Sequence, residues 1–217
     1  MHAPMASQIK EAAAHPLFRV VANAFDEGYT RSMNWQSTQW NQGVSLQKSA
    51  GIQFSFEFPA PPGQVNAIQA DRGALKIGQT ITVTYWVRKT QGNPKFISLD
   101  PAPVPPGLRA NFRPMLQVAN DDYDTQDNRW WPTGVNGCAF LPDDLTGTNH
   151  TVSVQILPNL WANVLGGLGT ARMNKFHKVI GHSGKLNIVF GGGNSFSHGV
   201  RIKNGKAQLV LVSLTIQ

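Results

Sequence analysis

The sequence contains a single cysteine and no long apolar segment. Cys138 alone cannot form an internal disulfide or a cysteine-based metal cluster, so side-chain packing has to stabilise the fold. No run of about 18 apolar residues occurs, so the sequence contains no candidate transmembrane helix. The N-terminal residues lack a basic start followed by an unbroken apolar stretch, so we expect no intact secretory leader.

The sequence is also poor in the residue patterns that catalysis requires. Its glutamates are Glu11, Glu27 and Glu57, whereas a glycosidase needs two carboxylates that converge on one bond. The six histidines show no metal-ligand spacing, and residues 193–197 (GNSFS) lack the final glycine of a nucleophile elbow. We therefore expect a protein that is not an enzyme. A polysaccharide-degrading enzyme on a sandwich fold is the third hypothesis, after two non-catalytic ones.

Acidic residues are absent from the C-terminal third of the chain. All 12 carboxylates and 12 of the 19 Lys and Arg residues lie within residues 1–144, so the net charge of +7 belongs to the remainder. The basic residues of that remainder are Arg172, Lys175, Lys178, Lys185, Arg201, Lys203 and Lys206. This asymmetry favours an acidic partner, either a glycan or an acidic protein surface, in a homo-oligomer or larger assembly. Nucleic acid is less favoured, because the basic residues are spread thinly without interleaved aromatic residues.

Glycine, proline and short alternating apolar runs are abundant. The 21 Gly and 14 Pro residues indicate many turns. In residues 79–88 apolar side chains alternate with threonines, as in a half-buried strand, and we also place Trp86 of this strand in the core. The expected core includes Ile81, Val83, Tyr85, Leu209, Leu211 and Leu214. Further strands are expected at residues 51–58, 95–99, 115–119, 151–157, 185–190 and 207–216.

Few helices are expected. A short helix is predicted in an N-terminal arm (residues 1–17). Residues 170–180 predict one amphipathic helix whose buried stripe comprises Met173, Phe176, Val179 and Ile180. The dipeptide Asn204-Gly205 predicts a two-residue hairpin turn, because both turn positions need positive φ. The predicted fold is therefore an all-β antiparallel sandwich of jelly-roll type, formed by residues 18–217 as one domain.

Two adjacent tryptophans form the main candidate ligand site. Trp130 and Trp131 point to opposite sides of a predicted strand, so we expect one of them to be an exposed plate for a sugar ring. Planar polar groups that would bind sugar hydroxyls are close in sequence, namely Asp124, Asn128 and Arg129. Trp35 and Trp40 are further candidates for exposed plates.

The acidic stretch before these tryptophans is a candidate calcium site. Calcium prefers oxygen ligands of the kind that Asp121, Asp122, Asp124 and Asp127 supply. The glycine and the terminal glutamate of an EF-hand are missing, and Arg129 follows at once. A solvated loop, or a salt-bridge partner for the basic residues, is the favoured interpretation, with no cofactor.

Two segments resemble strands of known jelly-roll families. Residues 79–88 (QTITVTYWVR), preceded by Lys76-Ile77-Gly78, resemble a strand of carbohydrate-binding modules with the galactose-binding-like jelly roll. Residues 185–216 (KLNIVFGGGNSFSHGVRIKNGKAQLVLVSLTI) are similar to the closing strands of secreted bacterial PEP-CTERM-type domains. The similarity lies in strands and turns, so it implies a fold more than a set of ligand-binding residues.

Two non-catalytic functions are consistent with these patterns. The leading hypothesis is an extracellular jelly-roll binding module of carbohydrate-binding type. The alternative is a structural virion protein, such as a phage decoration, fibre or tail component, that assembles through its N-terminal arm and its basic C-terminal third. We expect such an assembly to weaken as salt is raised, because salt screens charge contacts.

Overall fold

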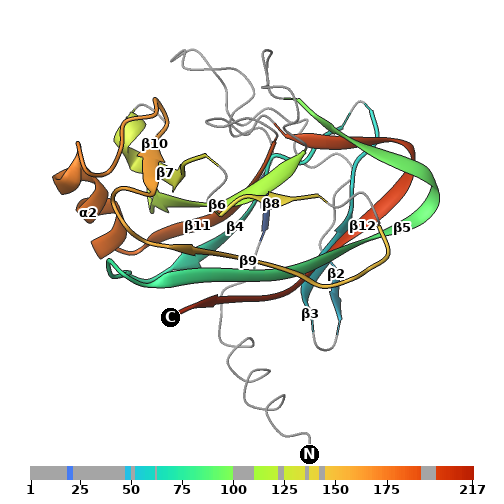
Figure 1. Ribbon diagram of the computed structural model, residues 1–217, viewed down its shortest axis with the longest axis horizontal. Helices are drawn as coiled ribbons and strands as arrows, with labels where there is room; N and C mark the ends of the chain where they lie inside the picture. Colours follow the sequence, from blue (N-terminus) through green and yellow to red (C-terminus); the bar gives the residue numbers. More distant parts are fainter. Residues whose placement is uncertain are drawn as a thin grey trace, which may run out of the picture.

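The protein folds as two antiparallel β-sheets packed face to face, with little helix (Figure 1). The computed structural model describes residues 19–21, 47–49, 52–61, 63–99, 110–121, 125–134, 137–141, 145–191 and 199–217. The all-β antiparallel sandwich predicted from the sequence is therefore confirmed, whereas the predicted N-terminal arm lies outside the described residues. No helix among the described residues is long and apolar enough to cross a membrane.

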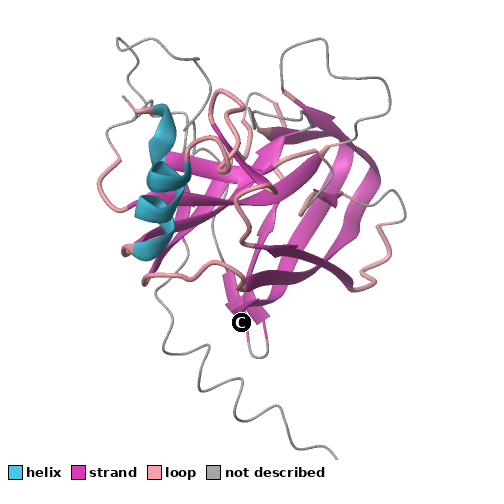
Figure 2. Ribbon diagram, turned by 60° about the vertical axis from the view of Figure 1, so that its left-hand side comes forward, coloured by secondary structure: helices cyan, strands magenta, loops and turns pink. Residues whose placement is uncertain are grey.

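Sheet A has seven strands and sheet B has five. The order in sheet A is β1 (Arg19–Val21), β4 (Ala67–Arg72), β11 (Gly184–Gly191), β6 (Asn111–Val118), β7 (Arg129–Pro132) and β10 (Trp161–Asn163), and β8 (Ala139–Phe140) pairs with β6. The order in sheet B is β2 (Gln47–Ser49), β3 (Ile52–Glu57), β12 (Val200–Ile216), β5 (Thr80–Ser98) and β9 (His150–Gln155). The described helices are the 3-10 turn η2 (Gln126–Asn128) and the α-helix α2 (Met173–Gly181), which Figure 2 shows at one side of the strands.

Aromatic side chains join the two sheets across the core. Phe56 of β3 packs edge-on against Phe190 of β11, with ring centroids 5.8 Å apart. Tyr85 of β5 meets Phe112 of β6 at 4.6 Å. The core positions predicted from the alternation are confirmed, since five of them are buried and Leu214 packs against them; the five are Ile81, Val83, Tyr85, Leu209 and Leu211.

Strands β5 and β12 pair along almost their whole length. Their register runs from Ile81 opposite Ile216 to Ser98 opposite Val200, and both strands bend together (Figure 1). Residues 79–88 and 95–99 therefore belong to one strand, and the hairpin predicted at Asn204-Gly205 is wrong. The φ angles of Asn204 and Gly205 are 61° and 155°, so their positive φ serves a bulge within β12 and not a turn.

Helix α2 covers the end of the sandwich beside β7 and β10 (Figure 1). Its residues Phe176, Val179 and Ile180 are buried as predicted, and Phe176 packs against the Trp130 ring at 5.0 Å. Met173 is 40% exposed, so its predicted place on the buried stripe is wrong. Met173 is the first residue of the helix and precedes the turn that packs against the sheet.

Arg72 ties the C-terminal end of α2 to sheet A. Its Nη2 donates to Val179 O (2.6 Å) and its Nη1 to His182 O (2.9 Å), where a helix leaves carbonyl groups without partners. The same guanidinium donates to the carbonyls of Gly73 and Lys185. Burial lowers the pKa of Arg72 to about 10, so the group remains charged at neutral pH and complements the helix dipole.

Replacing Arg72 by Met should lower the free energy of unfolding by about 2–4 kcal/mol, because the buried Val179 carbonyl and three part-buried carbonyls lose a charged donor. Urea unfolding followed by tryptophan fluorescence measures this change. Lys175→Met, on the exposed side of α2, is the matched control and should stay within about 0.5 kcal/mol of the parent protein. Equal stabilities for the two variants would contradict this role of Arg72.

Candidate functional site

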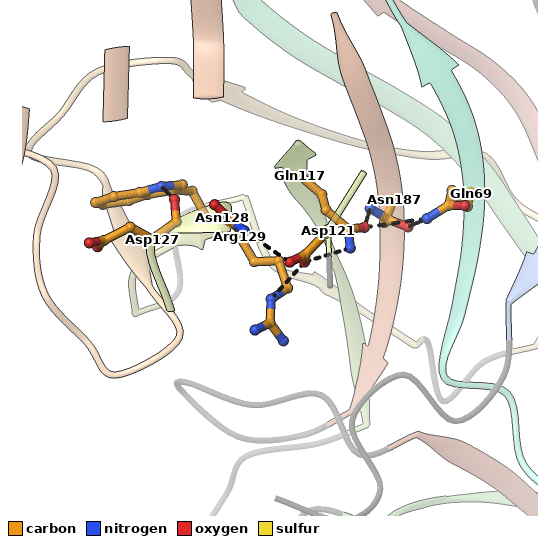
Figure 3. A network of polar contacts seen from close by, with 8 residues as sticks. Gln69, Gln117, Asp121, Asp127, Asn128, Arg129 and Asn187 are labelled. Carbon is orange, nitrogen blue, oxygen red and sulfur yellow. Dashed lines mark hydrogen bonds and ion pairs between the residues drawn. The ribbon is translucent and has the colours of Figure 1, made fainter. Parts of the chain in front are cut away.

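A ladder of polar side chains crosses the outer face of sheet A (Figure 3). Core residues alternate with Gln69 of β4, Asn187 of β11 and Gln117 of β6, so these three side chains point away from the sandwich interior. Gln69 Nε2 donates to Asn187 Oδ1 (2.8 Å), and Asn187 Nδ2 donates to Gln117 Oε1 (3.0 Å). Gln117 Nε2 continues the ladder by donating to Asp121 Oδ2 (2.8 Å).

The ladder includes three of the predicted site residues, namely Asp121, Asn128 and Arg129. Asp121 Oδ1 accepts a hydrogen bond from Asn128 Nδ2 (3.2 Å), and Asp121 Oδ2 lies 3.0 Å from Arg129 Nε as an ion pair. The side chains of Arg129 and Asp121 are only 3% and 1% exposed. Because these groups are buried and already bind one another, we interpret the ladder as a structural network that orders the outer face of sheet A.

Neither indole of the predicted tryptophan pair is an exposed plate. Trp130 points into the core with 0% exposure, and its Nε1 donates to the backbone oxygen of Asp127 (2.7 Å). Trp131 points to the opposite side of β7, as the alternation predicts, but it is 2% exposed. The prediction of an exposed plate here is wrong, because β7 is buried on both faces. Trp35, Trp40 and Asp124 lie outside the described residues and stay predictions.

Asp127 is the centre of a second polar cluster, beside α2. Its Oδ1 accepts a hydrogen bond from Asn163 Nδ2 (2.8 Å), and its Oδ2 lies 3.0 Å from Arg172 Nη1. Asn163 Oδ1 in turn accepts hydrogen bonds from the backbone of Leu165 and Gly167. The cluster therefore fixes the glycine-rich turn between β10 and α2.

The calcium prediction remains untested. Of its four carboxylates, Asp121 and Asp127 bind separate sets of protein donors, whereas Asp122 and Asp124 lie outside the described residues. The described part of the chain holds no group of three or more His, Cys, Asp or Glu side chains placed for a metal.

Cys138 lies beside Asn111 and Arg113 of β6. Its Sγ donates to Asn111 Oδ1 (3.3 Å). Burial raises the pKa of the Cys138 thiol, and the nearby Arg113 opposes that rise only in part. The thiol is therefore protonated at neutral pH, which is the less nucleophilic form.

The predicted basic residues separate into two groups at opposite ends of the molecule (Figures 1 and 2). Arg172, Lys175 and Lys178 are exposed at α2, and nearby Lys185 forms an ion pair with Asp71. Arg201, Lys203 and Lys206 lie on the first half of β12, where that strand pairs with the second half of β5. Each group is smaller than the single basic surface that the sequence suggested.

Trp86, which the sequence predicts to be a core residue, is partly exposed on the outer face of sheet B. Trp86 follows Thr82 and Thr84 in the outward register of β5, while Tyr85 and Val87 point inward. The prediction that Trp86 is a core residue is therefore wrong. The alternation that places Thr82 and Thr84 on the outer face also places Trp86 there, so the position of Trp86 could have been predicted from the sequence.

Polar groups surround Trp86 on both sides. The Arg88 guanidinium carbon lies over its ring, 5.4 Å from the centroid, and Arg88 Nε donates to Gln208 Oε1 (3.1 Å). Gln208 Nε2 donates to Ser55 Oγ (3.1 Å). On the other side Thr84 Oγ1 lies 3.2 Å from Thr151 Oγ1, and Ser213 stands opposite Thr84 on β12. We call this surface the Trp86 face; it comprises Ser55, Thr84, Trp86, Arg88, Thr151, Gln208 and Ser213.

Comparisons with known proteins give no family. No protein-family model and no curated protein matches the chain. Among solved structures, a "xylan-binding module CBM15" is 14% identical, with a TM-score of 0.40 over 90% of this chain and 97% of its own. A chain described by the words "Prominent members of the human gut microbiota express endo-acting O-glycanases to initiate mucin breakdown" is 12% identical, with a TM-score of 0.39 over 92% of this chain and 90% of its own.

A third solved structure, described as "CBM4 structure and function", is 14% identical, with a TM-score of 0.30 over 94% of this chain and 90% of its own. At such low identities and TM-scores, these likenesses do not determine what this chain binds. The expected resemblance to PEP-CTERM-type domains finds no support in them.

Alanine at Trp130 and at Trp86 should have very different effects on stability. Trp130→Ala leaves a cavity in the core and should cost about 3–5 kcal/mol of unfolding free energy. Trp86→Ala removes a partly exposed ring and should cost about 1 kcal/mol. Urea unfolding of both variants measures these changes. Equal losses of unfolding free energy would contradict the assignment of Trp130 to the core and of Trp86 to the outer face of sheet B.

Proposed function

We propose that the chain is a non-catalytic glycan-binding module whose ligand lies against the Trp86 face of sheet B. The single observation that carries the proposal is a partly exposed indole set among hydroxyl, amide and guanidinium groups on one face of a rigid sheet. An aromatic ring covers the C–H side of a sugar, and the polar groups around it bind the hydroxyls.

The Trp86 face can receive such a ligand because it is open. Thr151 is exposed, and Trp86, Thr84 and Ser213 are partly exposed. Arg88 uses Nε to bind Gln208, and its two Nη groups make no hydrogen bond to the described part of the chain. Those groups are therefore available as donors. The strands beneath them hold the face rigid, which reduces the entropy lost on binding.

The polar ladder of sheet A is chemically similar but less suited to the role. Gln69, Gln117 and Asn187 are 5%, 3% and 1% exposed, and each of them already pairs with its neighbour. A sugar would have to replace existing buried hydrogen bonds there. On the Trp86 face it would mostly replace water, which costs less.

The assembly hypothesis, in which the chain is a structural virion protein, stays a prediction. The same applies to the salt-sensitive association that it implies.

Trp86→Ala should weaken glycan binding about tenfold, because an aromatic plate typically contributes about 1–2 kcal/mol. The measurement is affinity electrophoresis of the full chain through gels that contain xylan, β-glucan, mucin or polygalacturonate, followed by calorimetry with the polysaccharide that retards it. Leu165→Ala is the matched control, since Leu165 is 62% exposed at the other end of the molecule, and it should bind like the parent protein.

Two results would overturn the proposal. The first is the absence of retardation by every polysaccharide. The second is unchanged affinity in the folded Trp86→Ala variant, which would remove the Trp86 face as the site.

A further inference from the structure

Sheet B carries almost no negative charge. Its five strands contain one carboxylate, that of Glu57. The same strands contain seven cationic residues, namely Lys48, Arg88, Lys89, Lys95, Arg201, Lys203 and Lys206. The positive charge of the protein is thus concentrated on the sheet that also presents Trp86. Four of the cations, Lys48, Arg88, Lys89 and Lys95, come from the part of the sequence that is neutral overall.

From these observations we infer that the glycan is anionic, a polysaccharide with carboxylate or sulfate groups that runs from the Trp86 face onto the basic ribbon. The basic ribbon is defined as residues 88–98 of β5 together with residues 200–208 of β12. The inference rests on the proposed function and adds the chemical class of the ligand.

Three cations of the basic ribbon, Lys95, Arg201 and Lys203, face away from the core. Phe96 and Ile202 stand opposite each other and pack on the core side, so the flanking pairs Lys95–Lys203 and Ile97–Arg201 project outward. Directly opposed side chains lie about 4.5–5.5 Å apart at Cβ, and like charges there destabilise a sheet. A multivalent anion bound across the ribbon would offset that repulsion.

Within the described part of the chain, neighbouring groups do little to neutralise the ribbon. Lys206 Nζ lies 3.6 Å from Glu57 Oε1, with both side chains about half exposed. Arg201 Nε is buried and makes no hydrogen bond within the described part of the chain. Lys95 and Lys203 are exposed.

The basic ribbon adjoins the aromatic plate. Arg88 belongs to both surfaces, because it stacks on Trp86 and is the first residue of the ribbon. The cationic group at α2 lies at the other end of the molecule (Figures 1 and 2). A chain that stacks one sugar on Trp86 can therefore place its next acidic groups over the ribbon and not over α2.

An anionic polysaccharide fits this surface better than a nucleic acid does. Proteins that bind single strands place successive bases on several aromatic rings. Among the described residues, Trp86 is the aromatic side chain that lies on the outer face of sheet B between the Thr84–Thr151 pair and the basic ribbon. One ring beside a line of separated cations suits a polymer whose saturated rings alternate with acidic groups.

The test compares two double variants of the full chain with the same change in net charge. Lys95→Gln/Lys203→Gln removes the opposed pair on the ribbon, and Lys175→Gln/Lys178→Gln removes two exposed lysines on α2. Affinities are measured by calorimetry for polygalacturonate, dextran sulfate, neutral xylan and a duplex DNA oligonucleotide. Each titration is repeated at about 0.05 and 0.5 M salt, over which the Debye length shrinks several-fold.

We expect the ribbon variant to lose about tenfold in affinity for polygalacturonate or dextran sulfate at low salt, and the α2 variant to stay within about twofold of the parent. The acidic polymer that binds more tightly distinguishes carboxylate from sulfate recognition. One result would overturn this inference and leave the proposed function intact. In that result, xylan binds through Trp86 as tightly as the acidic polymers do, and the ribbon variant has unchanged affinity. Two results would overturn both the inference and the proposed function. The first is DNA that binds more tightly than every polysaccharide. The second is an equal loss of affinity in the two double variants, combined with no effect of Trp86→Ala.

Discussion

The pairing of β5 with β12 is the constraint on which the rest of the structure depends. These strands stay in register from one end of sheet B to the other, apart from bulges at which both strands bend. Their inward side chains include Tyr85 and Leu209, which build the core against sheet A. The same register turns Thr84, Trp86 and Arg88 outward. The core and the Trp86 face are therefore the two sides of one strand pair. A shift of one residue in the register would exchange the inward and outward side chains.

The two sheets put similar polar residues to different uses. On sheet A, glutamine, asparagine, aspartate and arginine side chains are buried and satisfy one another from β4 to β7. On sheet B, threonine, glutamine and arginine side chains remain accessible around one indole. Buried polar groups with complete partners rigidify a fold, whereas accessible ones can exchange water for a ligand. This contrast in burial is the basis for placing the glycan on sheet B.

Alternation along single strands predicted the sandwich and most of its core, because a period of two depends only on neighbouring residues. It also separated Trp130 from Trp131 correctly, but it could not show that β7 is buried on both faces, which depends on the rest of the fold. Trp86 was misassigned although it stands in register with the outward threonines. Asn204-Gly205 was read as a turn because positive φ suits a turn and a bulge alike. The basic ribbon could not be predicted, because Lys95 meets Lys203 only through strand pairing.

The most direct test of the account is to map the ligand contact on the ¹⁵N-labelled protein by NMR during titration with an acidic oligosaccharide such as oligogalacturonate. The largest shift changes should fall on the indole N–H of Trp86, on the amides of residues 84–88 and 208–210, and on those of the basic ribbon. Changes confined to the side-chain amides of Gln69, Gln117 and Asn187, with none at Trp86, would contradict it and would move the ligand to sheet A.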